Sequence, residues 1–173
     1  MLSALVVAES MWGNTRAVAD AVAQGLGKKA DVVDVQEARS KLSDDVSLLV
    51  VGGPTHAFSM SRTTTRHDAV QRGARGAHEA QGLREWLEHL PPSDHVGVAT
   101  FDTRVAGVKR LPGSAAKAAG KEVRRHHLGR LIATQSFYVN DLEGPLLDGE
   151  LDRAHEWGTQ LRSLASTTEE NAR

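Results

Sequence analysis

The chain has 173 residues, of which 40% are hydrophobic and 25% charged, and its formal net charge at pH 7 is −1. These values are typical of one globular domain, and they exclude a disordered or collagen-like chain and a strong overall field that would attract nucleic acid or an acidic membrane surface. The absence of cysteine excludes disulfides, iron–sulfur clusters, thiolate zinc sites and thiol nucleophiles, so that any redox role requires a bound cofactor.

The N-terminal half of the chain alternates strand and helix patterns. The apolar, mostly β-branched run at residues 4–9 predicts a buried strand, and the spacing of the apolar residues in 18–26 predicts a helix. Two further strands are expected at residues 31–35 and 46–53. The second of these ends in a glycine pair followed by Pro54, which indicates a sharp turn.

The C-terminal half continues this alternation. Helical patterns occur at residues 63–72, 83–90 and 114–125, strand patterns at 95–101 and 131–139, and a last helix is expected from Asp148. We expect Ser114 to cap its helix, and the last helix to bury Leu151, Ala154, Trp157, Leu161 and Leu164. Residues 1–165 are predicted to form a single domain, and residues 166–173 a frayed tail.

Five strands that alternate with helices predict an α/β fold with a doubly wound, five-stranded parallel sheet. Ligands of such sheets bind beyond the carboxyl ends of the strands, where the strand order reverses. Functional residues are therefore expected just after the first, third and fourth strands, in the segments 9–15, 52–61 and 100–107.

The junction between the first strand and the first helix has the character of an anion site. Backbone N–H groups at a helix start lack partners within the helix, and the helix dipole adds positive charge there. Gly13 allows a tight turn, and Ser10, Asn14 and Thr15 offer side-chain donors. The chain has no Walker loop, Rossmann fingerprint or nucleophile elbow. The sequence therefore predicts a phosphate site without a cationic side chain, and the alternative is that Ser10 or Asn14 only caps the helix.

Two segments resemble a known family. Residues 10–15, SMWGNT, resemble the T-x-T-G-N-T phosphate loop of flavodoxins and are similar to the loop of flavodoxin-like NAD(P)H:quinone oxidoreductases. Residues 53–56, GPTH, resemble the G-x-P-T turn that both groups place beside the flavin ring. The strand rhythm matches over nearly the whole chain. The resemblance implies a flavodoxin-like sheet of order 2-1-3-4-5 and noncovalently bound FMN.

Carried over position by position, the resemblance assigns cofactor binding to three loops. The ribityl phosphate would be held by the side chains of Ser10, Asn14 and Thr15 and by the backbone amides of Met11, Trp12, Gly13, Asn14 and Thr15. One side of the isoalloxazine ring would be lined by Pro54, Thr55, His56, Ala57 and Phe58. The other side would be lined by Thr100, Phe101, Asp102, Thr103 and Arg104.

The resemblance implies electron transfer through FMN with a redox partner protein. A cytoplasmic location is expected because the sequence shows neither a signal-peptide pattern nor an apolar run of membrane-spanning length. One alternative is an enzyme, an oxidoreductase of the quinone reductase type that uses NAD(P)H and quinone. A second alternative is a cofactor-free interaction scaffold. No metal site, nucleic-acid partner or membrane span is expected, no catalytic residue is assigned, and the number of subunits stays open.

Charge is unevenly divided along the second half of the chain. Residues 109–130 contain seven Lys or Arg and one acid, Glu122, whereas residues 141–173 contain eight acids and three arginines. Two solvated helix faces would explain this division, and so would a docking surface for an acidic partner or for the phosphates of NADPH. The Arg-rich stretch 62–81 is likewise open between a solvated loop and a lid that contacts a substrate or a second subunit.

Overall fold

The computed structural model describes residues 2–171 and the side chains of residues 2–166. Its centre is a parallel five-stranded sheet of order β2-β1-β3-β4-β5. The strands are β1 (Ala4–Ala8), β2 (Ala30–Asp34), β3 (Leu48–Pro54), β4 (Gly97–Val105) and β5 (Arg130–Val139). This order confirms the predicted doubly wound α/β sheet.

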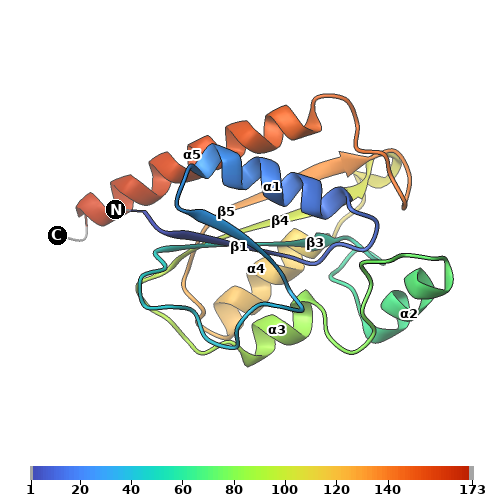
Figure 1. Ribbon diagram of the computed structural model, residues 1–173, viewed down its shortest axis with the longest axis horizontal. Helices are drawn as coiled ribbons and strands as arrows, with labels where there is room; N and C mark the ends of the chain where they lie inside the picture. The colour runs from blue at the N-terminus through green and yellow to red at the C-terminus, as the bar shows by residue number, and fades with distance from the viewer. Residues whose placement is uncertain (1, 172–173) are drawn as a thin grey trace.

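Helices cover both faces of the sheet (Figure 1). On one face, α1 (Asn14–Leu26) packs against α5 (Glu150–Asn171), and on the other face α3 (Leu83–His89) packs against α4 (Ala115–Arg125). The short helix α2 (Thr63–Gln71) lies beyond one end of the sheet, and a single 3₁₀ turn (Ala106–Val108) follows β4. No helix within residues 2–171 combines the length and the apolar composition that crossing a membrane requires.

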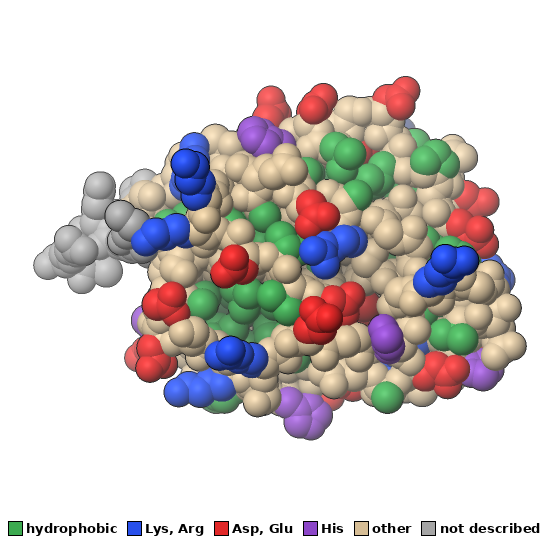
Figure 2. Space-filling model, viewed as in Figure 1, with side chains coloured by type: hydrophobic (Ala, Val, Ile, Leu, Met, Phe, Trp, Pro, Cys, Tyr) green, Lys and Arg blue, Asp and Glu red, His purple; other side chains and the backbone are tan. Residues whose placement is uncertain are grey.

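The crossover from β2 to β3 contains no helix, so one part of the sheet is thinly covered. A groove remains there, with Leu5, Val33 and Leu42 among its lining residues. Figure 2 shows it as a shallow hollow with hydrophobic side chains at its floor. The connection therefore runs over the surface as irregular chain and leaves the edge strand β2 partly exposed.

The helix α5 is held by a narrow contact with α1. Ala154, Trp157 and Leu161 are buried as predicted, and Trp157 meets Phe101 and Phe137 edge to face with ring centroids 5.9–6.2 Å apart. Leu151 and Leu164 were wrongly predicted to be buried, because each is about half exposed. They flank a contact in which the two helix backbones meet closely at Gly25 and Gly158. α5 continues to Asn171, and residues 172–173 of the tail predicted to fray lie outside the described residues.

Strand β4 extends to Val105, beyond its predicted end at residue 101, because residues 102–105 still pair with β5. Asp102, Thr103 and Arg104 therefore lie in a strand and not in a loop. Successive side chains of a strand point to opposite faces of the sheet. As a result, Thr103 faces one helical layer while its two neighbours face the other.

Helix α2 is anchored by an arginine with no exposed surface. The guanidinium of Arg66 donates to Glu85 Oε1 at 3.0 Å, to Ser61 Oγ at 2.9 Å and to the carbonyl of Glu79 at 3.1 Å. Ser61 donates in turn to the buried carboxylate of Glu9, which also accepts the N–H of Leu83 at 2.8 Å. This network joins the end of β1 to α2 and α3, so the stretch 62–81 is not a freely solvated loop.

Burial and hydrogen bonding in this network shift the pKa values of its two acids in opposite directions. Burial raises the pKa of Glu9 above its ordinary value, even though Leu83, Ser61 and Arg66 favour the charged form. Partial burial would also raise the pKa of Glu85, but the hydrogen bonds from Arg66 and the backbone outweigh burial and hold that pKa below its ordinary value.

We expect the substitution Arg66→Leu to lower the free energy of unfolding by about 3–5 kcal/mol, because it removes the cation from a buried group of acids and leaves polar atoms without partners. Urea denaturation followed by circular dichroism measures the change. Arg75→Leu, at an exposed arginine of the same segment, is the matched control and should change stability by less than about 0.5 kcal/mol. Equal effects of the two substitutions would contradict the anchoring role of Arg66.

Candidate functional site

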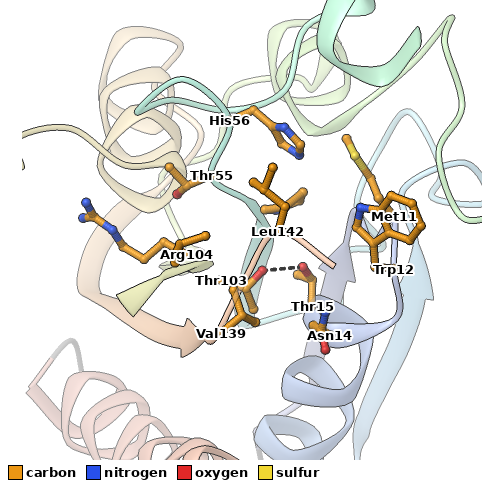
Figure 3. Close-up of a pocket in the computed structure, with 12 residues that line it drawn as sticks. Met11, Trp12, Asn14, Thr15, Thr55, His56, Thr103, Arg104, Val139 and Leu142 are labelled. Atoms are coloured by element: carbon orange, nitrogen blue, oxygen red, sulfur yellow. Dashed lines mark hydrogen bonds between the residues drawn. The ribbon is translucent and has the colours of Figure 1, made fainter. Parts of the chain in front are cut away.

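A cleft opens at the carboxyl ends of β1, β3, β4 and β5 (Figure 3). Nine of the residues predicted to bind a cofactor line it: Met11, Trp12, Asn14, Thr15, Pro54, Thr55, His56, Thr103 and Arg104. Three residues that were not predicted, Val105, Val139 and Leu142, complete the wall. Among the described side chains, those of residues 2–166, no group of three or more His, Asp or Glu could hold a metal ion.

The backbone at the start of α1 leaves a row of amide groups unpaired. Gly13 has a φ of 93°, which turns the chain sharply into the helix. Ser10 Oγ accepts the N–H of Arg16 at 3.1 Å, and the carbonyl of Gly13 accepts the N–H of Ala17 at 3.0 Å. The N–H groups of residues 11–15 have no acceptor in the described part of the chain. Five unpaired N–H groups at a helix N-terminus form a cradle suited to an anion.

The N-terminus of α4 lies at the same edge of the sheet but is closed by protein groups. Thr55 Oγ1 accepts its first N–H group at 2.9 Å, the buried carboxylate of Asp102 accepts the second at 2.8 Å, and the hydroxyl of Ser114 accepts a third at 3.3 Å. The cap predicted at Ser114 is thereby confirmed. Because a carboxylate already fills this helix start, an additional anion is favoured at α1 and disfavoured at α4.

Side chains at the cradle are partly engaged by neighbouring elements. Asn14 Nδ2 donates to the carbonyl of Glu143 at 3.0 Å, which ties the loop after β5 to the start of α1. The hydroxyls of Thr15 and Thr103 are 2.8 Å apart (dashed line in Figure 3). Whichever of these hydroxyls accepts still has its own proton to donate, so the pair keeps one donor for a ligand.

The cleft wall carries one cation. Arg104 is 5% exposed, and its guanidinium donates to the carbonyls of Val108 at 2.9 Å and Leu111 at 3.2 Å, which fixes the loop after β4. Its Nε has no partner among the described residues. A buried cation with an unused donor lowers the energy of a negatively charged or electron-rich group beside it.

His56 points into the cleft, whereas the guanidinium of Arg104 is directed away from it, toward the loop after β4 (Figure 3). Burial lowers the pKa of His56 below its ordinary value of 6.5, so the imidazole is neutral at pH 7 and offers one donor and one acceptor. The backbone of His56 also pairs with Ser59 through two hydrogen bonds, which close a two-residue hairpin turn.

The two central residues of this turn adopt an unfavourable backbone conformation. Ala57 and Phe58 have φ values of 46° and 61°, in the left-handed region that glycine and asparagine normally occupy. Strain of this kind persists where the surrounding structure fixes it, and it clusters at functional sites. Both side chains are exposed and lie outside the cleft lining, although the sequence places them beside the ring.

Three other residues assigned to the flavin ring also lie outside the cleft lining, as do Ser10 and Gly13 of the phosphate loop. Thr100 bonds to the carbonyl of Ala116 and to Thr134, and Phe101 is fully buried in the core beside α5. Asp102 caps α4. The structure therefore brings Thr103 and Arg104, but not these three side chains, to the cleft.

The cradle is supported from outside by the segment that follows α2. Gly76 donates its N–H to the carbonyl of Met11 at 3.2 Å, and Met11 packs against Ala69 and Ala74. A Cβ atom at Gly76 would lie 2.1 Å from the carbonyl oxygen of Ser10. This position therefore requires glycine for close backbone approach, a need that the sequence pattern of the loop did not reveal.

Comparison with solved structures identifies the fold. An archaeal flavodoxin matches with a TM-score of 0.61 and 15% identity over 95% of this chain and 99% of its own. Oxidised flavodoxin 1 from Bacillus cereus matches with a TM-score of 0.63 and 12% identity over 91% and 95%. The diflavin flavoprotein A3 from Nostoc sp. matches with a TM-score of 0.55 and 17% identity over 100% and 99%. No family model and no curated protein matches the sequence. The fold is therefore flavodoxin-like, as the sequence predicted.

We expect Gly76→Ala to weaken the binding of a phosphate group in the cradle, with FMN as the probe, at least about tenfold, because the new methyl group displaces the Ser10 carbonyl and with it the cradle. Isothermal titration calorimetry measures the affinity. Gly97→Ala is the matched control, since its Cβ would meet neighbours only at 3.7 Å, an ordinary contact. Unchanged affinity in the Gly76 variant would show that the cradle does not depend on this support.

Proposed function

We propose that the protein binds FMN noncovalently in the cleft and transfers electrons through it. The observation that supports this most directly is the row of five unpaired N–H groups at residues 11–15, which matches the need of a phosphate held without lysine. The flavodoxin-like fold places this cradle at the carboxyl edge of the sheet. The names of the matching structures, flavodoxins and a flavoprotein, agree with the proposal.

In this proposal the residues at the start of α1 hold the ribityl phosphate. The amides of residues 11–15 donate to it, together with the hydroxyl pair Thr15–Thr103 and with Ser10, whose proton has no acceptor in the described chain. Asn14 remains bonded to Glu143 and fixes the loop after β5. Thr100 and Phe101 are left out because their side chains lie in the interior.

The flavin ring would occupy the cleft between the His56 turn and Arg104. FMN, when bound, supplies the capacity to take up and release electrons. Arg104 favours the negative charge that accompanies reduction, and neutral His56 can donate one hydrogen bond to the ligand. Trp12 and Leu142 shield the cleft with apolar surface, which excludes water and strengthens these interactions.

Titration with FMN distinguishes this proposal from a cofactor-free scaffold. We expect quenching of flavin fluorescence on addition of the protein and at least about tenfold weaker binding of riboflavin, because riboflavin lacks the phosphate that the charged hydrogen bonds hold. Unchanged FMN fluorescence, with no change in the absorbance spectrum, would favour the scaffold.

Two variants locate the binding site. Asn14→Asp should weaken FMN at least about tenfold and riboflavin little, because it places a negative charge beside the phosphate. Gln24→Glu adds the same charge at an exposed position of the same helix and should leave both affinities unchanged. Equal losses for FMN and riboflavin in the Asn14 variant would show that the phosphate lies elsewhere.

A second hollow favours an enzyme as the alternative function. It adjoins the cleft, with which it shares Trp12, His56 and Leu142, and the rest of its lining comes from Thr65, Asp68, Ala69 and Arg72. Arg72 and Asp68 form no ion pair among the described residues. A second small molecule with an anionic group would find a cation here, which suits an NAD(P)H-dependent quinone reductase.

Steady-state quinone reduction with NADPH separates the two functions. Turnover above about 1 per second, with a raised KM for NADPH in the variant Arg72→Ala, would support the enzyme. Reduction of the holoprotein by a flavodoxin reductase without NADPH:quinone turnover would support the electron carrier. Arg75→Ala, at an exposed arginine outside the lining of the hollow, is the control.

A further inference from the structure

Outside the cleft, five cationic side chains lie along α4 and the loop before it without any ion pair. We call them the basic face: Lys109, Arg110, Lys117, Lys121 and Arg124. All five are exposed, and none has an ion-pair partner in the described part of the chain. The three on α4 are spaced i, i+4 and i+7, so they project from one side of the helix. Glu122, the acid of this helix, is engaged by His126 at 3.1 Å and Arg125 at 3.7 Å and does not neutralise the row.

The basic face begins at the mouth of the proposed FMN site. The first turn of α4 is bonded to Thr55 and Asp102, which places the helix start beside the cleft. Lys109 and Arg110 belong to the loop that Arg104 fixes through the carbonyls on either side of them. Lys109, Arg110 and Lys117 therefore lie near the cleft, while Lys121 and Arg124 extend the row along α4 away from it.

Two exposed apolar side chains lie on or beside the loop between β4 and α4. Phe58 is 46% exposed and Leu111 is 47% exposed. A Cβ atom at Gly113 would lie 2.7 Å from the carbonyl oxygen of Phe58, so the turn that carries Phe58 packs directly on the loop that carries Leu111. An aromatic and an aliphatic side chain next to a row of cations match the composition of a protein interface, in which aromatic residues and arginine are enriched.

The basic face differs in charge from the rest of the surface. Exposed acids without basic neighbours in the sequence lie between β5 and α5, at Asp141, Glu143 and Asp148, so the side of the cleft that Leu142 lines is acidic and the side toward α4 is basic. The face shown in Figure 2 carries acidic and basic side chains interspersed. Since the net charge of the whole chain is only −1, the charge of the basic face is a local feature that orients an approaching partner.

We propose that the basic face, together with Phe58 and Leu111, is the docking surface for an acidic redox protein that exchanges electrons with FMN in the cleft. This inference rests on the proposed electron-carrier function and adds to it the surface and the charge of the partner. A protein partner is favoured over a nucleic acid because the exposed apolar side chains lie at the mouth of the redox site, where they contribute nothing to phosphate contacts.

Electron transfer to two haem proteins of opposite charge tests the proposal. The holoprotein, reduced beforehand with dithionite, is mixed in a stopped-flow instrument with the soluble domain of cytochrome b5, which is acidic, or with cytochrome c, which is basic. One electron leaves the reduced FMN and converts ferric haem iron to ferrous iron. We expect the rate constant for cytochrome b5 to fall at least about tenfold between low and high salt, and that for cytochrome c to stay constant or rise.

Charge reversal identifies the surface. The double variant Lys117→Glu/Lys121→Glu should lower the rate constant for cytochrome b5 at low salt at least about tenfold. Lys28→Glu/Lys29→Glu, two exposed lysines between α1 and β2, makes the same change in net charge and should have little effect. Leu111→Ala, which shortens an exposed side chain outside the cleft lining, should weaken docking at every salt concentration without altering FMN content. Equal effects of the two double variants, or no salt dependence, would overturn the proposal.

Binding to immobilised cytochrome b5 is measured with and without FMN, so that the docking surface and the binding of FMN are tested independently. Loss of binding in the Lys117/Lys121 variant supports the docking surface even if the protein takes up no FMN. Tight FMN binding with no affinity for cytochrome b5 would overturn the docking surface and leave the cofactor proposal standing. Binding of a 20-base-pair DNA duplex as tight as that of cytochrome b5 would also overturn it.

Discussion

The site is built around one unmet requirement of the backbone, which is that N–H groups at a helix start need acceptors. Gly13 turns the chain so that residues 11–15 enter α1 with their N–H groups unpaired in the described structure. At the same edge of the sheet, α4 meets this requirement internally, with Asp102 as its anion. The difference between the two helix starts favours an external anion at α1 over α4, and the position of FMN in our proposal follows from it.

The fold brings this cradle to a topological switch point and then stiffens it. In the strand order 2-1-3, the chain leaves β1 toward β2 and leaves β3 toward β4, in opposite directions along the sheet. The cleft lies where β1 and β3 end. Burial of the Arg66 charge costs desolvation energy, but the hydrogen bonds from Arg66 to Ser61 and Glu85 fix α2 in place. The segment after α2 then contacts the cradle through Gly76, so a buried ion network supports the loop that forms the cradle. A preformed site loses less entropy when its ligand binds.

The five strands and the cradle could be predicted because they depend on local patterns, namely apolar runs and a glycine between polar donors. The strand order came instead from the resemblance of two loops to those of flavodoxins. Phe101 shows where local reasoning ends, since only the pairing of β4 with β5 reveals that its side chain faces the core. Leu142 was not predicted to line the cleft. It follows β5 at the carboxyl edge of the sheet, where functional residues were expected only after the first, third and fourth strands. Gly76 and Arg66 act through contacts with distant residues, and no periodicity in the sequence encodes such contacts.

Nuclear magnetic resonance of the ¹⁵N-labelled protein tests the central claim most directly, because an amide that donates to a phosphate shows a downfield proton shift. Our account predicts that the amide protons of residues 11–15 move downfield on addition of FMN and that riboflavin leaves them nearly unchanged. Amides of α4, which already have acceptors, should change little with either ligand. Saturation with FMN without a shift at residues 11–15, or with the main shifts at the start of α4, would contradict the account.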